Sequence, residues 1–315
     1  ARVEQAAAWV ESASAKLYPE LNALGNFSGK GTSSGGLNYG GLFASWELDL
    51  WGRVRSGREA AQQQLLSAEL ANRYARQSLA AMVARAWFLA CEARLQKELA
   101  EAMVQSAEAL VRLAGERMRL GNGNEYDVAV AKAGLANYRD AAEQLDLAWR
   151  QSVQAIETLV GRYPAAELDV PATLPHLPGP VPAGIPSELL ERRPDVVAAE
   201  RRVAAAFYRI EEAKAARLPA LSISGSVSTL SSDLILLKER DDYVWGYGGR
   251  IVAPLYLGGS LQAQIRLRSA EQEEAIADYG RAGAAAFADV ERTLAASNTL
   301  QAREALLAEA VREGE

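Results

Sequence analysis

Alternating apolar and polar positions mark two predicted hairpins along the chain. In the hairpin over residues 218–257, odd-numbered positions from Leu221 to Val227 are aliphatic or glycine, and serines fill the positions between them. Odd-numbered positions from Tyr243 to Ile251 are aromatic, aliphatic or glycine. A period of two predicts strands that each have one apolar face.

The other predicted hairpin, over residues 18–50, is less regular. Its first strand alternates from Leu21 to Phe27. In its second strand the alternation changes phase between Phe43 and Trp46, which predicts a bulge or a bend. Together the two hairpins give four strands.

Long segments without this pattern predict long helices. Residues 54–118 contain no proline, and Gly57 and Gly115 are their only glycines. At ~1.5 Å per residue this segment would extend ~97 Å as a helix, far beyond the ~11–12 residues of an average helix. Alanine and regularly spaced leucine, with Arg, Gln and Glu between them, favour a coiled-coil wall. The GNGN sequence at 121–124 predicts a turn, and so an antiparallel helical hairpin over 53–161.

The same order of elements occurs twice. Residues 15–21 (AKLYPEL) correspond to residues 215–221 (AARLPAL) at an offset of 200. Residues 48–53 (LDLWGR) correspond to residues 255–260 (LYLGGS) at an offset of 207. These matches predict two structural copies, each consisting of a helix, two strands and a long helix.

The predicted organisation follows from these boundaries. The first repeat spans residues 1–163, with a helix end at 1–17, a β-hairpin at 18–50 and the helical hairpin at 53–161. A Pro-rich linker spans 164–186. The second repeat spans 187–315, with a helix at 187–217, a β-hairpin at 218–257 and a helix at 258–315. Both ends of the chain fall inside predicted helices, so we expect a longer protein in which the second repeat continues.

Composition and charge exclude several classes of function. The net charge of -6 argues against nucleic-acid binding, which needs clustered Lys and Arg. The single cysteine, Cys91, and the single histidine, His176, leave no constellation for nucleophilic catalysis or for a cysteine-based metal site. No phosphate-binding loop is recognisable. We therefore expect no enzymatic activity, no cofactor and no metal.

Four strands per chain are too few to close a barrel. In lipid a sheet survives only as a closed barrel, because every backbone group must be paired. Three copies would supply twelve strands and two would supply eight. We expect Leu221, Ile223 and Val227 to face lipid and the intervening serines to face the lumen. Aromatic residues at strand positions and strand ends predict a membrane interface. They are Trp46, Trp51, Tyr243, Trp245, Tyr247 and Tyr256.

The same facts leave an alternative open. A soluble coiled-coil scaffold or interaction protein could pack its two hairpins on a helical bundle. Dependence on detergent separates the two interpretations, because only the barrel exposes an apolar face to lipid.

Three segments resemble one known family. Residues 45–55 (SWELDLWGRVR) resemble the strand-to-helix junction of TolC-type outer-membrane efflux proteins, most closely the lipoprotein branch that serves resistance-nodulation-division multidrug pumps. Residues 186–196 (PSELLERRPDV) resemble the start of that branch's second repeat. Residues 119–121 (RLG), followed by Asp127 and Val128, resemble the periplasmic helix tip. The resemblance covers essentially the whole chain.

The resemblance implies a TolC-like fold, mainly α with a β-barrel portion and an internal two-fold repeat. It implies a homotrimer in the bacterial outer membrane, with a twelve-stranded transmembrane barrel and coiled-coil hairpins that form a periplasmic tunnel. Such a trimer is a passive duct for drugs or other small solutes. Its partners are a periplasmic adaptor, an inner-membrane pump and outer-membrane lipid. The signal peptide, the lipidated N-terminal cysteine and the second helix tip of the family have no counterpart among the 315 residues.

The resemblance also implies roles for residues at the tip. Leu120, Gly121 and Asn122 align with the adaptor contact, although Asn122 departs from the family's common Val-Gly-Leu. Asp127 aligns with a carboxylate that latches the tunnel through an arginine on the second hairpin. The alternatives stay open: a glycine-stopped helix end at Gly121, and at Asp127 an acidic residue favoured by the helix dipole.

Overall fold

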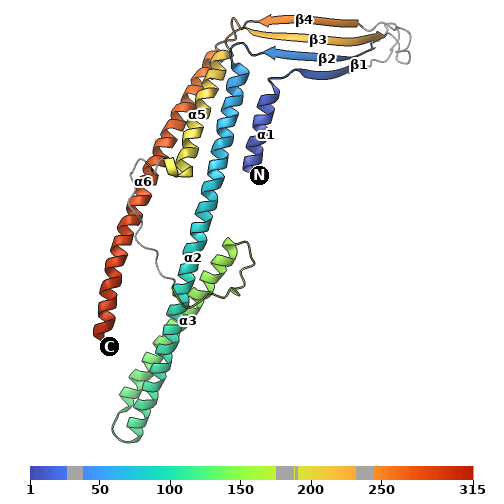
Figure 1. Cartoon of the computed structure of the whole chain (residues 1–315). Helices are drawn as coiled ribbons and strands as arrows, with labels where there is room; N and C mark the ends of the chain where they lie inside the picture. The colour runs from blue at the N-terminus through green and yellow to red at the C-terminus, as the bar shows by residue number, and fades with distance from the viewer. Residues whose placement is uncertain (27–37, 175–187, 189–190, 232–243, 315) are drawn as a thin grey trace. The chain divides into compact units, whose positions relative to one another are not determined.

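We describe the protein from a computed structural model, which defines residues 1–26, 38–174, 188, 191–231 and 244–314. The described residues form helices and strands in the order drawn in Figure 1. They are α1 Arg2–Ala15, β1 Glu20–Asn26, β2 Asn38–Leu48, α2 Arg53–Arg119, α3 Glu125–Leu159, α5 Pro194–Ala215, β3 Ala220–Ser231, β4 Val244–Val252 and α6 Ser260–Gly314.

The chain divides into two compact units, which are described separately. The first, the sheet unit, comprises Ala1–Tyr74 and Gly184–Glu315. The second, the hairpin unit, comprises Ala75–Ala183. His176, most of the Pro-rich linker and Tyr243 lie outside the described residues. Among the residues that the structure does describe, no helix has both the length and the apolar character needed to cross a bilayer.

The sheet has four antiparallel strands in the order β1-β2-β3-β4 (Figure 1). β2 pairs with β3 one residue to one residue from Leu48 to Asn38. The predicted bulge between Phe43 and Trp46 is therefore wrong. Phe43 lies on the polar face opposite Asn22 and Ser226, and the pairing runs one residue to one residue through it on both sides, so the strand continues without a change of phase.

The internal repeat is visible in the backbone. Gly52 and Gly259, which are 207 residues apart, both have positive φ (76° and 81°) immediately before a long helix. The first helical hydrogen bonds also correspond, from Ser56 N–H to Gly52 O and from Ala263 N–H to Gly259 O. Positive φ is costly for residues with a Cβ, so each copy places a glycine where its chain leaves the sheet.

Small residues bring the helices of the sheet unit close together. The buried face of α5 is built largely from alanines, including Ala198, Ala199, Ala205 and Ala206. The buried Ser67 hydroxyl of α2 donates to the Ala198 carbonyl of α5 at 2.8 Å. A Cβ on Gly57 would lie 3.1 Å from the Glu212 carboxylate, so glycine there permits the approach of α2 to α5.

The hairpin unit has a small core of its own. Ala90 and Cys91 of α2 pack with Val153 and Ile156 of α3 and with Val170 of the segment that follows. Burial raises the pKa of the Cys91 thiol. Because Val170 is almost fully buried, the first part of the predicted linker is packed against the helical hairpin.

One buried carboxylate holds that segment in place. Glu157 accepts hydrogen bonds from the main-chain N–H groups of Ala166, Glu167 and Leu168 at 2.8, 2.9 and 3.1 Å. Burial raises the pKa of Glu157, but these donors together outweigh it and lower the pKa below the ordinary glutamate value. Ala166 has a positive φ of 59°, which turns consecutive N–H groups towards the carboxylate.

Candidate membrane segment and helical tip

One face of the sheet is apolar across all four strands. Directly opposed residues in antiparallel strands share a face, so the pairing assigns every described position. The apolar face holds Leu21, Ala23, Gly25, Gly40, Leu42, Ala44, Trp46, Leu48, Leu221, Ile223, Gly225, Val227, Trp245, Tyr247, Gly249 and Ile251. Between Gly40 and Leu48 of β2, and between Leu221 and Val227 of β3, no position of this face is charged; beyond them the same face continues through Asn38, Thr229 and Ser231, which are polar residues. Along β2 this face extends ~27 Å, from the eight steps of ~3.4 Å between Gly40 and Leu48, or about 20 Å in depth at a barrel strand's tilt.

The opposite face carries the polar residues. It holds Glu20, Asn22, Ser45, Glu47, Ser222, Ser224, Ser226, Ser228 and Arg250. Leu24, Phe43, Ala220, Val244 and Val252 are apolar residues on the same face. The alternation predicted for β3 therefore extends to a whole sheet with one lipid-like face and one water-like face.

The predicted interface aromatics divide into two groups. Trp46 and Trp51 lie where the sheet meets the helices, and each indole N–H donates to a main-chain carbonyl, Leu17 O at 2.9 Å and Pro219 O at 2.8 Å. Trp245 and Tyr247 stack on the apolar face of β4 with ring centroids 6.0 Å apart. Tyr256 follows β4 and is 86% exposed. Aromatic rings thus occur towards both ends of the strands, as interfacial girdles do.

The strand-to-helix junction is tied by charged residues that sequence reasoning did not single out. Arg53 donates twice to the Glu47 carboxylate, at 3.0 and 2.6 Å. Asp49 accepts from the Val54 and Arg55 N–H groups at 3.0 and 2.8 Å, and so caps the start of α2. Partial burial raises the pKa of Asp49, but these N–H groups and the Arg55 guanidinium lower it overall.

The helix tip is a capped turn. Gly121 has φ 77°, Asn122 N–H donates to Arg117 O, and Gly121 N–H donates to Met118 O, which is a Schellman motif. The Asn124 side chain then accepts from Asp127 N–H at 2.8 Å and caps α3. Helix α2 therefore ends in a glycine C-cap at Gly121. This geometry does not test the predicted contact with an adaptor.

The side chains proposed for contacts at the tip are open to solvent. Leu120 is 66% exposed, and Asn122 and Asp127 are also exposed. Tyr126, 74% exposed, lines a groove of about 390 Å³ with Asp127. Within the described part of the chain no ion pair involves Asp127. These side chains are therefore accessible to solvent.

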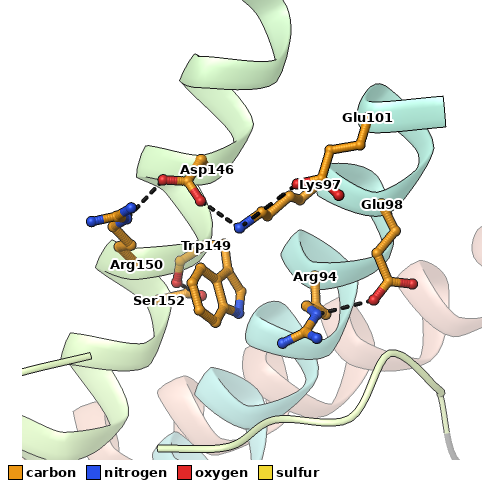
Figure 2. Close-up of polar contacts among 8 residues, drawn as sticks. All are labelled: Arg94, Lys97, Glu98, Glu101, Asp146, Trp149, Arg150 and Ser152. Carbon is orange, nitrogen blue, oxygen red and sulfur yellow. Dashed lines mark hydrogen bonds and ion pairs between the residues drawn. The ribbon is translucent and has the colours of Figure 1, made fainter. Parts of the chain in front are cut away.

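Farther along the hairpin unit, an ion-pair cluster clamps α2 to α3 (Figure 2). Lys97 of α2 donates to Asp146 of α3 at 2.5 Å, and Arg150 donates to the same carboxylate at 2.7 Å. The Lys97 ammonium also lies 4.6 Å from the centre of the Trp149 ring. The hydrogen bond from Lys97, more than any other contact, lowers the pKa of Asp146. This cluster fixes the register of the two helices.

The described residues contain no group of three or more His, Cys, Asp or Glu side chains placed to hold a metal ion. The structural features of interest are instead the two-faced sheet, its open edges and the exposed helical tip.

Comparison with known proteins decides the family. The model of the outer membrane efflux protein family matches residues 1–162 and 185–315. The chain belongs to this family. Its TolC-like fold is accordingly shown, with long helical hairpins and four strands that contribute to a barrel.

Individual relatives agree with this assignment. The pyoverdine export outer membrane protein OpmQ of Pseudomonas putida is 32% identical over 314 residues, covering 94% of this chain and 66% of that protein. The cation efflux system protein CusC of Escherichia coli is 30% identical over 309 residues, covering 95% and 66%. A crystal structure of a membrane protein from Pseudomonas aeruginosa superposes with a TM-score of 0.88 at 32% identity, covering 96% of this chain and 73% of that one. The chain therefore spans slightly less than two-thirds of these two curated relatives.

Proposed function

We propose that this chain is the outer-membrane protomer of an export system and forms a passive duct for small solutes. The observation that carries the proposal is the sheet face, apolar across all four strands and backed by a serine-rich face. A lipid-facing barrel wall needs this pairing of surfaces. A soluble scaffold would have to cover the apolar face, yet Trp245 and Tyr247 are 72% and 84% exposed and Ile223 is about half exposed.

The duct is a homotrimer with a twelve-stranded barrel. One chain contributes four strands whose outer edges lack partners within the described sheet. A spanning barrel cannot keep such edges. Membership in the outer membrane efflux protein family supports three copies, which close the ring with twelve strands.

The helical tip contacts a periplasmic adaptor, through which the duct joins an inner-membrane pump. Leu120, Gly121 and Asn122 form the contact, supported by their exposure around a tightly capped turn. Asp127 latches the tunnel by pairing with a cation of another hairpin. Its exposed position in the first turn of α3 leaves it accessible to such a partner.

The duct does not select its cargo, and it catalyses no reaction. OpmQ is named for pyoverdine export and CusC for cation efflux, although this chain is about equally similar to both. A wall that serves such different solutes fits a water-filled lumen lined by serine hydroxyls. The choice of cargo then falls to the pump.

Thiol labelling tests this function. Single cysteines replace Ser224 or Ile223, neighbours on opposite faces, in full-length protein whose Cys91 is changed to Ala. In intact outer membranes a water-soluble maleimide should label Ser224→Cys and spare Ile223→Cys. Equal labelling of the two sites, or recovery of the protein in the soluble fraction without detergent, would favour the scaffold interpretation.

A further inference from the structure

A cleft of about 590 Å³ lies between α1, α2 and α5 within the sheet unit. Figure 1 shows α1 and α5 on either side of the first part of α2. The lining residues lie between Arg2 and Lys16 on α1 and between Gly57 and Ala68 on α2, with Arg209 and Glu212 on α5. Sites for small molecules have volumes of ~300–1,000 Å³. This α1–α2–α5 cleft is therefore large enough for one small organic molecule.

The inner surface of the cleft is apolar. Its buried lining residues are Ala6 of α1 and Ala60 of α2, and further alanines line it at Ala61 and Ala68. Alanine presents only a methyl group, so these helices leave a hollow between them. Trp9 of α1 also lines the cleft and is 65% exposed. A methyl-lined floor beside an open indole ring suits a flat apolar group, which can stack on the ring.

Positive charge predominates around this floor. Arg2, Lys16 and Arg209 are cations, and Glu212 is the one carboxylate among the lining residues. Among the ion pairs of the described residues, none includes any of these three cations. The whole chain has a net charge of -6, so a cationic cleft runs against its overall balance. Guanidinium and ammonium groups that lack a protein partner are suited to bind a carboxylate or another oxyanion.

The cleft opens on the same side as the polar face of the sheet. Glu47 belongs to that face, and Arg53 at the start of α2 donates to its carboxylate. Gly57 lies one helical turn after Arg53 on the same side of α2, and Gly57 lines the cleft. Arg53 thus connects the serine-rich face of the sheet with the lining side of α2. In the duct proposed above the polar face borders the lumen, so the cleft lies on the lumenal wall.

We propose that the α1–α2–α5 cleft binds organic anions that carry an aromatic ring as they pass through the duct. The ring stacks on Trp9 over the alanine floor, and the anionic group pairs with the cations around it. The site rests on the duct function proposed above, because only a duct brings exported solutes to this wall. Since the cleft is open to solvent, we expect weak binding, with a Kd on the order of 1 mM. Such a site delays a solute without excluding others, so the choice of cargo stays with the pump.

Calorimetric titration of the full-length protein in lipid nanodiscs measures the binding, with empty nanodiscs as the blank. The probe is 1-naphthalenesulfonate, which combines an aromatic ring with one anionic group. Two comparison probes separate these features: 1-naphthylmethylammonium has the ring with a positive charge, and methanesulfonate has the anion without a ring. At low ionic strength, where screening is weak, 1-naphthalenesulfonate should bind about tenfold more tightly than either. Equal binding of the three probes, or no binding of 1-naphthalenesulfonate, would overturn the site.

Matched variants assign the binding to this cleft. Arg209→Gln removes one cation from the cleft, and Arg202→Gln removes an exposed cation of the same helix that does not line it. The first should weaken binding of 1-naphthalenesulfonate by about two- to fivefold, and the second should leave it unchanged. Trp9→Ala should weaken binding by about two- to tenfold, and Trp9→Phe, which keeps a ring, should retain most of the affinity. Equal affinities for the two arginine variants, or full affinity for Trp9→Ala, would show that the probe binds elsewhere and overturn the site.

Channel currents in planar bilayers separate the site from the duct itself. If the cleft faces the lumen, 1-naphthalenesulfonate should reduce the current half-maximally near its Kd, and Trp9→Ala should require correspondingly more probe. Binding that leaves the current unchanged would place the cleft on the outer wall and overturn its lumenal role. A conducting channel that neither binds the probe nor responds to it refutes only the site, whereas a protein that forms no channel refutes the duct as well.

Discussion

An arginine placed on one face or the other of β3 should have opposite consequences. Ile223 lies on the apolar face opposite Trp46 and Gly249, and Ser224 lies on the polar face opposite Ser45 and Gly248. The two positions are adjacent in sequence and differ in depth by only about 3 Å. Ile223→Arg and Ser224→Arg therefore form a matched pair that differs mainly in the face.

The expected loss of stability depends on the depth of the substituted residue in the bilayer. The apolar face along β2, from Gly40 to Leu48, is centred at Ala44, which pairs with Gly225 of β3. Ile223 therefore lies about 7 Å along the strand from the centre, or roughly 5 Å in depth at a 35–45° tilt. Arginine on the lipid face costs ~2–4 kcal/mol at the midplane and ~0–1 kcal/mol near the interface. We expect Ile223→Arg to lower the free energy of unfolding by about 2 kcal/mol per chain. Ser224→Arg should cost less than ~1 kcal/mol, because its head reaches lumenal water.

Equilibrium unfolding in urea, with full-length protein refolded into thin-bilayer vesicles, measures both values. A shift in midpoint at unchanged m gives the difference in stability. Equal costs for the two variants, or a larger cost for Ser224→Arg, would refute the assignment of faces and with it the barrel.

Three further predictions concern the hairpin unit and are measured on full-length protein. Asp127→Ala should leave folding intact, because one exposed ion pair contributes only ~0.2–1 kcal/mol to stability. Loss of the latch should raise the resting conductance in planar bilayers. Unchanged conductance across a range of salt concentrations would contradict the latch role. Gly121→Glu should block adaptor assembly in pull-down while the isolated channel still conducts, whereas Gly121→Ala should cost only ~1–2 kcal/mol through its positive φ; normal assembly of the Glu variant would remove the adaptor contact. The pKa of Glu157 is lowered in the folded state, so its contribution to folding stability is complete at pH values above the ordinary glutamate pKa and is lost as the pH falls through the folded-state pKa. Hydrogen exchange at the Ala166 to Leu168 amides should therefore show protection that decreases in acid. Glu157→Gln should abolish that pH dependence.

Periodicity was sufficient to predict most of the regular structure. The alternation at Leu221 to Val227 and the glycine turn at residues 121–124 are local patterns, and the structure has a strand and a helix turn there. The bulge expected near Phe43 failed because alternation within one strand does not reveal the neighbours of each face. Asn22 and Ser226, the residues opposite Phe43 on the polar face, belong to other strands.

Contacts between residues far apart in the sequence cannot be predicted from periodicity. Glu157 looks like one more helical acid, and only the fold brings three N–H groups of residues 166–168 to it. The pairing of Lys97 with Asp146 likewise depends on the register of the helical hairpin. Asp49 was closer to prediction, because an acid shortly before a long helix is a common cap.

The central claim is that copies of this chain close one barrel in the membrane. Native mass spectrometry of the full-length protein, released from outer membranes in mild detergent, measures the number of copies directly. The account predicts a trimer as the main species, because four strands per chain then make a ring of twelve. A monomer or a dimer as the main species would contradict it.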